Sequence, residues 1–292
     1  TISAKASDYT VVKTFKNGDP DKFVKLGDSI PFVITTTFPS YEDGTDNRTF
    51  TITDTPTGMK ITDIKVKVGN DDLQAGTDYT LDKTLPSTEA VTVNFATDYI
   101  GTENTHAGKT VTVEVTATVT EAGKYSNEAT TNKASDPSKV EGETGSITIN
   151  KVDKGNNVLK GAEFSVALDG TKLEFVEVET GVYRLATADD AADTKVTNVV
   201  ATNGSVVVKG LDEGTYNIVE EKAPKGYSVV DVPNQTISAG QNANITVKVT
   251  DTKLSALPHT GGIGTTIFTI AGCAIMVAAA FFFFTSRKKA NK

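Results

Sequence analysis

The sequence predicts an all-β protein: two tandem Ig-like β-sandwich domains followed by a C-terminal transmembrane helix. Residues 110–119 alternate strictly between apolar side chains and Thr or Glu, which indicates a strand buried on one face. Short runs rich in Thr and Val recur between turns built from Gly, Asn, Asp and Pro, as in sandwiches. Residues 262–285 carry no charge and, at about 1.5 Å per residue, can span a bilayer core of about 30 Å.

The short runs fall into two predicted domains, residues 1–133 and 145–252. Their clearest strands are predicted at residues 50–53, 61–68, 91–95, 110–119, 147–152, 205–208 and 245–249. Between the domains, the segment 134–144 is polar and contains Pro137 and Gly142, so we expect a linker there.

Composition excludes several classes of function. The net charge is −8, so the chain is a poor binder of nucleic acid, which needs clustered Lys and Arg. The one cysteine, Cys273, cannot form an intrachain disulfide, and two histidines cannot make a His-rich metal site. The sequence has no Gly-rich phosphate loop and no HExxH motif. We therefore expect no metal, no cofactor and no turnover enzyme.

The two ends of the chain suggest export. Arg287, Lys288 and Lys289 directly follow the apolar span and act as a membrane stop, so residues 286–292 should form a short cytoplasmic tail. By the same rule the acidic body lies outside the membrane. The sequence begins at Thr1 without an apolar leader, so we expect a mature or truncated piece that lacks at least a signal peptide.

A pentapeptide in the segment 253–261 completes the pattern of the C-terminus: Leu257-Pro258-His259-Thr260-Gly261. Together with the apolar span and the basic tail, it resembles the cell-wall sorting signal of sortase substrates. The resemblance implies that a sortase cysteine cleaves between Thr260 and Gly261 and passes the Thr260 acyl group to an amine. The chain would then be membrane-anchored only before sorting, and afterwards covalently attached at the cell surface, to peptidoglycan or to a neighbouring subunit.

Six polar residues share the apolar faces of predicted strands, because side chains two apart in a strand point the same way. In each domain a lysine lies on the first strand, an acid in the middle and an Asn or Asp on the last strand. The residues are Lys13, Asp54 and Asn127 in the first domain, and Lys151, Glu220 and Asp251 in the second.

Two interpretations of these residues are open. They form salt bridges or lie at the surface near strand ends, or they form intramolecular isopeptide bonds. In the second case burial leaves a neutral lysine amine, and the protonated acid polarises the target carbonyl. Lys13 would attack Asn127 and release ammonia, and Lys151 would attack Asp251 and release water, with Asp54 and Glu220 as the catalysing acids.

Two further segments resemble sortase-assembled Gram-positive pilins. Residues 216–227, YNIVEEKAPKGY, look like the E-box of these proteins, and 151–164 resemble the opening of their collagen-adhesin B-type domain. The first domain is similar to the isopeptide-forming domain of backbone pilins at residues 12–14, 26–30, 52–55 and 125–129. The resemblance implies the two isopeptides and assigns the catalysing role to Glu220. It departs from the usual pattern at Asp251, where many such domains have Asn.

The resemblance predicts a structural subunit of a covalently polymerised pilus, with sortase and neighbouring pilins as partners. A spacer that could carry a lone adhesin across the wall is absent between Asp251 and Leu257, which favours a backbone subunit. The acceptor lysine motif of backbone pilins is also absent, so an ancillary pilin or a wall-anchored adhesin for host matrix is the alternative.

Overall fold

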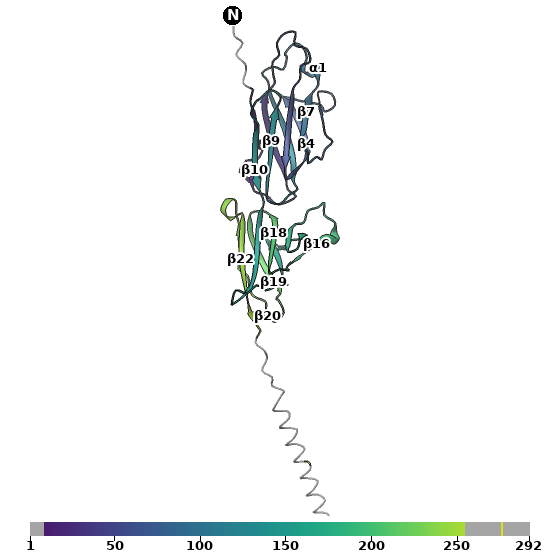
Figure 1. Cartoon of the computed structure of the whole chain (residues 1–292). Helices are drawn as coiled ribbons and strands as arrows, with labels where there is room; N and C mark the ends of the chain where they lie inside the picture. Colours follow the sequence, from purple (N-terminus) through teal and green to yellow (C-terminus); the bar gives the residue numbers. More distant parts are fainter. Residues whose placement is uncertain (1–8, 255–275, 277–292) are drawn as a thin grey trace, which may run out of the picture. The chain divides into compact units, whose positions relative to one another are not determined.

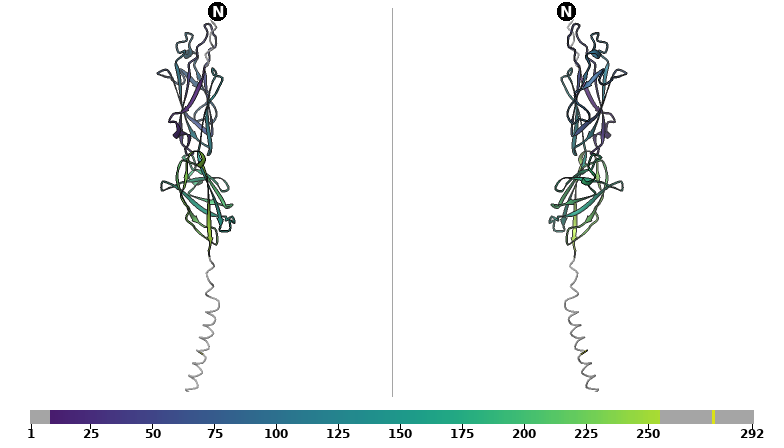
Figure 2. Two further views of the ribbon diagram at one scale, coloured as in Figure 1. Left: turned by 90° about the vertical axis from the view of Figure 1, so that its left-hand side faces the viewer. Right: turned by 90° about the vertical axis from the view of Figure 1, so that its right-hand side faces the viewer.

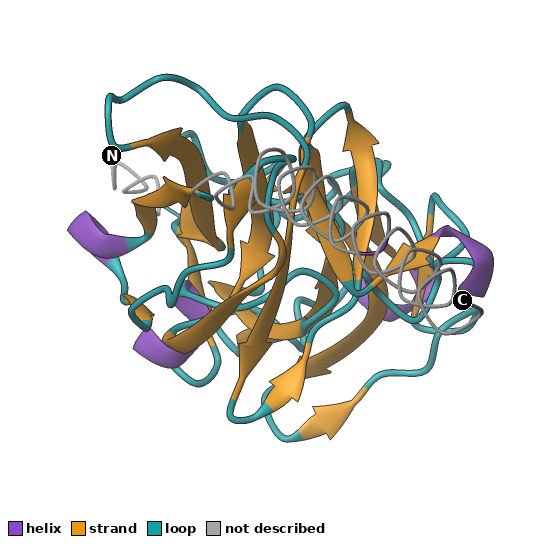
Figure 3. Ribbon diagram, turned by 90° about the horizontal axis from the view of Figure 1, so that it is seen from below, coloured by secondary structure: helices purple, strands orange, loops and turns teal. Residues whose placement is uncertain are grey.

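The computed structural model describes residues 9–254 and Met276. Within residues 9–254 the chain is built from strands in four sheets, with only short helical turns between them (Figures 1 and 3), which confirms the all-β prediction. Apart from Met276, the predicted membrane span lies outside the described residues. Among those that are described, the helices are too short or too polar to cross a bilayer.

The first domain is a sandwich of two five-stranded sheets, seen as two layers in Figure 2. The first sheet has the order β1 (Val11–Phe15), β2 (Ser29–Thr37), β8 (Thr110–Val119), β4 (Met59–Val68) and β5 (Asp71–Asp72). The second has the order β10 (Ser138–Glu143), β9 (Lys124–Thr131), β3 (Thr51–Thr57), β7 (Val91–Phe95) and β6 (Tyr79–Leu81). One helical turn, α1 (Thr97–Ile100), follows β7.

The alternating sequence of β8 explains its central place in the first sheet. Its Val and Ala side chains are buried, and its Thr and Glu side chains lie on the outer face. β8 pairs with β2 along one edge and with β4 along the other. The inward face therefore contributes a continuous apolar row to the core between the sheets.

The second domain packs a seven-stranded sheet against a smaller one. The larger sheet has the order β16 (Lys195–Val196), β14 (Phe175–Glu179), β15 (Val182–Leu185), β18 (Ser205–Leu211), β11 (Gly145–Asp153), β22 (Asn244–Lys253) and β20 (Tyr227–Ser228). The smaller has the order β13 (Thr171–Lys172), β12 (Ala162–Leu168), β19 (Gly214–Lys222) and β21 (Gln235–Ile237), and β17 (Asn198–Ala201) also pairs with β12. The first and last strands of the domain, β11 and β22, are parallel neighbours.

The segment that we expected to be a linker, 134–144, is mostly a strand. Its residues 138–143 form β10, which pairs with β9 at the edge of the first domain. Thr144 alone separates β10 from β11. Its N–H donates to Gly123 O at 2.9 Å, and its Oγ1 accepts the Gly123 N–H at 2.7 Å. Polar composition misled the prediction, because an edge strand with one exposed face needs few apolar residues.

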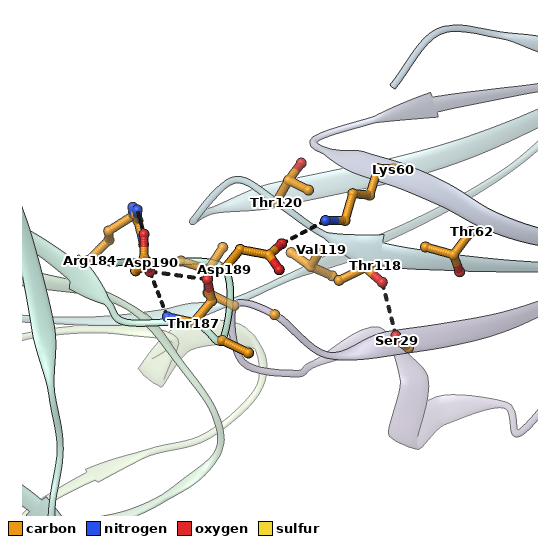
Figure 4. A pocket seen from close by; sticks show the side chains of 13 residues that line it. Ser29, Lys60, Thr62, Thr118, Val119, Thr120, Arg184, Thr187, Asp189 and Asp190 are labelled. Carbon is orange, nitrogen blue, oxygen red and sulfur yellow. Dashed lines mark hydrogen bonds and ion pairs between the residues drawn. The ribbon is translucent and has the colours of Figure 1, made fainter. Parts of the chain in front are cut away.

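Both β-domains fall within one compact unit, Thr1–Thr252, and they contact each other directly. The N–H of Leu26 donates to Gly210 O at 2.9 Å. Figure 4 shows a second contact, in which Lys60 Nζ lies 2.7 Å from Asp189 Oδ2 beside a polar hollow. Arg184 donates through both terminal nitrogens to Asp190, which fixes the loop that presents Asp189.

Candidate functional site: two buried lysine–acid clusters

All six polar residues that the sequence placed on apolar strand faces are buried. Each is at most 4% exposed: Lys13, Asp54, Asn127, Lys151, Glu220 and Asp251. This burial rules out a set of surface residues at strand ends. The structure gathers them into two clusters of three, one in the core of each domain.

The first cluster joins the two sheets of the first domain. Asp54 on β3 lies opposite Ala129 of β9, and Asn127 lies opposite Pro56, so the acid and the amide are diagonal neighbours on one face. Lys13 reaches them from β1 of the other sheet, and its Nζ donates to Asp54 Oδ1. An amide between Lys13 and Asn127 would connect β1 to β9 across the sandwich.

Two further residues hold Lys13 in this position. Its backbone N–H donates to Ser138 Oγ on β10 at 2.8 Å, which ties β1 to the edge of the second sheet. Its Nζ lies 5.0 Å from the ring centroid of Phe32, so an apolar surface covers the amine. The sequence prediction included neither residue, because Ser138 lay in the supposed linker and Phe32 has no polar signal.

Burial shifts the pKa values of both ionisable groups of this cluster. Removal from water lowers the pKa of Lys13, and the nearby Asp54 only partly offsets this effect. Burial likewise raises the pKa of Asp54, against the opposing influence of Lys13 and Asn127. The amine and the acid are thus both shifted toward their neutral forms, as nucleophilic attack on an amide requires.

The amide of Asn127 has no hydrogen bond of good geometry. Its Oδ1 and Nδ2 are both buried and unpaired, and so is Asp54 Oδ2. An unpaired polar atom in a core costs about 1–3 kcal/mol, so native proteins rarely contain three together. No described hydrogen bond therefore offsets the cost of burying these three atoms.

The second cluster has a different topology. Lys151 on β11 lies opposite Val249 of the parallel strand β22, and its Nζ donates to Asp251 Oδ1 two residues further along. Glu220 reaches in from β19 of the smaller sheet, with Oε1 2.9 Å from Lys151 Nζ. In the second domain Lys151 and Asp251 therefore lie in one sheet and Glu220 lies in the other. In the first domain Asp54 and Asn127 lie in one sheet and Lys13 lies in the other.

The acid of the second cluster is also shifted toward its neutral form. Burial raises the pKa of Glu220, which Lys151 and the N–H of Val230 only partly offset. The Val230 N–H donates to Glu220 Oε2 at 3.0 Å. The prediction had no signal for this donor, because it is a backbone group on a loop. Phe164 lies 5.9 Å from Lys151 Nζ, as Phe32 lies near Lys13.

Other parts of the predicted site lie elsewhere. The sorting residues 257–261 and the basic residues Arg287, Lys288 and Lys289 lie outside the described residues. The polar hollow of Figure 4 shares no residue with either cluster. Within residues 9–254, His, Cys, Asp and Glu form no group of three that could hold a metal ion.

Comparison with known proteins adds independent findings. Residues 145–253 match the family model of the SpaA prealbumin-like fold domain, and residues 250–291 match the LPXTG cell wall anchor motif. A fimbrial subunit type 2 of Actinomyces naeslundii is 25% identical over 95% of this chain. The chain spans 60% of the length of that relative.

Two solved structures share the fold. The pilus 2b backbone protein of group B streptococcus has a TM-score of 0.60 at 22% identity, over 84% of this chain and 99% of its own. The pilus backbone RrgB of Streptococcus pneumoniae has a TM-score of 0.59 at 14% identity, over 85% of this chain and 100% of its own.

The anchor motif and the prealbumin-like domain define a surface protein that is attached to the cell wall. Together with the fimbrial relative and the shared fold, these matches support a sortase-assembled pilin of the Gram-positive type.

Proposed function

We propose that the chain is a structural subunit of a covalently polymerised pilus, in which each β-domain closes its own isopeptide bond. The observation that carries the proposal is the pair of buried clusters, each of which brings an amine, a carbonyl group and a buried acid together. Lys13 would join Asn127 with loss of ammonia, and Lys151 would join Asp251 with loss of water. A neutral amide removes the cost of burying a charged lysine.

Each bond would close a loop of about a hundred residues. By the chain-entropy estimate for disulfides, such a closure stabilises the folded state by roughly 4–5 kcal/mol. Since each bond joins an early strand to the last or nearly last strand of its domain, tension applied at the ends would bypass most of the sheets. An amide also persists where a disulfide would be reduced.

Sorting would join the subunit to its partners. The proposal assigns cleavage between Thr260 and Gly261 to a sortase, and transfer of Thr260 to a lysine of a neighbouring pilin or to peptidoglycan. Binding to host matrix is a separate role that exposed loops would carry. A binding screen with residues 1–256 separates the two roles, since a purely structural subunit has little affinity for matrix proteins.

The intact mass of unfolded residues 1–256 tests the two bonds, and this piece keeps every described strand. We expect a deficit of about 35 Da: about 17 Da for lost ammonia and about 18 Da for lost water. Asp54→Asn should abolish only the loss of about 17 Da from the first domain, and Glu220→Gln only the loss of about 18 Da from the second. The full calculated mass for the unmodified sequence would refute both bonds and leave two buried ion pairs.

A further inference from the structure

The second cluster contains two buried oxygens without a hydrogen-bond partner: Glu220 Oε1 and Asp251 Oδ2. Lys151 Nζ is close to Glu220 Oε1, at 2.9 Å, but its orientation does not complete a hydrogen bond. Two ionised carboxylates can only accept, so neither can satisfy the other. A single proton on one of them changes this, because a neutral carboxyl group donates through its hydroxyl oxygen.

The N–H of Val230 distinguishes the two oxygens of Glu220. It donates to Oε2 at 3.0 Å, so that oxygen acts as the acceptor. In a neutral carboxyl group the carbonyl oxygen accepts and the hydroxyl oxygen donates. With Oε2 in the accepting role, the proton belongs on Oε1, the oxygen nearest to Lys151.

We propose that the backbone N–H of Val230 is a positioning group for bond formation in the second domain: it keeps the proton of Glu220 on Oε1, facing Asp251. This inference rests on the proposed Lys151–Asp251 amide and adds the group that orients its catalyst. It also gives Glu220 Oε1, one of the two unpaired oxygens, a proton to donate within the cluster.

The assigned proton balances the reaction. The neutral amine of Lys151 attacks Cγ of Asp251, and an N–C bond forms while Glu220 Oε1 delivers its proton to Asp251 Oδ2. Glu220 then takes a proton from the attacking nitrogen and passes it to the same oxygen of Asp251, the C–O bond breaks and one water molecule leaves. Glu220 ends ionised in place of Asp251, so protons and charge balance and no other reactant is needed.

The loop that carries Val230 is itself held against the strand of the target. Within this loop, β20 pairs with β22, and Ser228 Oγ donates to Thr252 O at 3.3 Å, one residue beyond Asp251. Val232 is buried, and Asp231 bridges to Val219 of β19. The donor, the acid and the target are therefore fixed to one another. The first cluster has no such donor, because Asp54 Oδ2 has no partner.

The test compares three forms of residues 1–256 with the unmodified sequence. Val230→Pro removes the N–H. Substitution of residue 230 by the α-hydroxy analogue of valine removes it as a backbone ester without the ring of proline. Val230→Ala is the matched control, since it keeps the N–H and shortens the side chain. Each chain is isolated unfolded from inclusion bodies and refolded at several pH values, and the loss of about 18 Da is followed by mass spectrometry.

We expect the two forms without the N–H to react about tenfold more slowly or worse, and Val230→Ala to react like the unmodified chain. The charged groups that face Glu220 are Lys151 and Asp251, and both stay in place. Because the N–H lowers the pKa of Glu220, its removal should also move the alkaline limit of the reaction to higher pH. A purely structural role would lower stability without that shift.

The outcomes are distinct. If the unmodified chain loses no water, both the proposed bond and this inference fail. If it loses water and the ester form reacts at the same rate with the same pH profile, the inference alone is refuted. If Val230→Pro does not fold, the ester form still decides between these results.

Discussion

At the residue scale, burial changes the acid–base behaviour of Asp54. Its carboxyl group lies in an apolar core, and burial raises its pKa. Its contact with Lys13 opposes this rise, so the charge of Asp54 depends on whether the lysine is present.

Lys13→Met excludes the proposed bond by removing the amine, and it leaves Asp54 without its cation. Between the ordinary pKa of Asp, about 3.9, and the raised value in the core, the folded state binds more protons than the unfolded state. The free energy of unfolding should therefore fall as the pH rises through this window, and be highest near its acidic end. Urea unfolding between about pH 4 and about pH 7.5 measures this slope.

The double variant Lys13→Met/Asp54→Asn is the control, because it removes the titrating group and keeps its shape. Its unfolding free energy should lack this component of the pH dependence. Equal slopes in the two variants would show that Asp54 is not the residue responsible.

The six cluster residues could be predicted because strand periodicity is short-ranged and strict. A polar side chain two positions from Val or Ile must share their face. Their grouping into one set for each domain was predicted as well, but parity does not say which strands pair or which sheet holds the acid. The hydrogen bond from the Val230 N–H to Glu220 could not be predicted either, because every residue except proline carries a backbone N–H.

At the scale of elements, the junction between β10 and β11 depends on one side chain. Thr144 is buried and exchanges two hydrogen bonds with Gly123 in the turn between β8 and β9. The hydroxyl accepts from a backbone N–H that no other described group satisfies. This pair fixes the end of the first domain to the start of the second.

Thr144→Val keeps the shape and removes the acceptor, which leaves the Gly123 N–H unpaired. We expect a loss of about 1–3 kcal/mol in unfolding free energy, measured by urea denaturation. Thr144→Ser keeps the hydroxyl and should lose less. A valine variant as stable as the serine variant would mean that water replaces the hydroxyl.

Elements with a strong alternating pattern were predicted well. The predicted strand at 110–119 coincides with β8, and that at 91–95 with β7. The prediction failed at β10, whose residues pair along one edge and remain half solvated. Tertiary pairing with β9, which no local pattern encodes, makes this segment a strand.

At the scale of the whole molecule, two backbones approach closely where the β-domains touch. A Cβ added at Gly210 would lie 2.8 Å from Leu26 Cβ, and Gly210 has a φ of +82°. Glycine is required there both for the backbone conformation and for the space. The hydrogen bond from Leu26 to Gly210 depends on this approach.

Gly210→Ala should destabilise the chain more than Gly226→Ala. Gly226 has a similar φ of +88° but open space around its Cβ position, so it reports the backbone strain alone. We expect the difference to be about 1–3 kcal/mol in unfolding free energy, because the Gly210 contact must open. Equal losses would indicate that Leu26 moves aside without cost.

The single residue between β10 and β11 also constrains how such a chain can change over generations. Loops between strands accept added residues at little cost, because their ends stay where they are. No loop beside Thr144 can accommodate one residue gained or lost. Either β11 shifts its register by one position and turns Lys151 out of the core, or the two hydrogen bonds between Thr144 and Gly123 break. Changes in chain length are therefore tolerated only at other places, and the short connection before β11 preserves the buried position of Lys151.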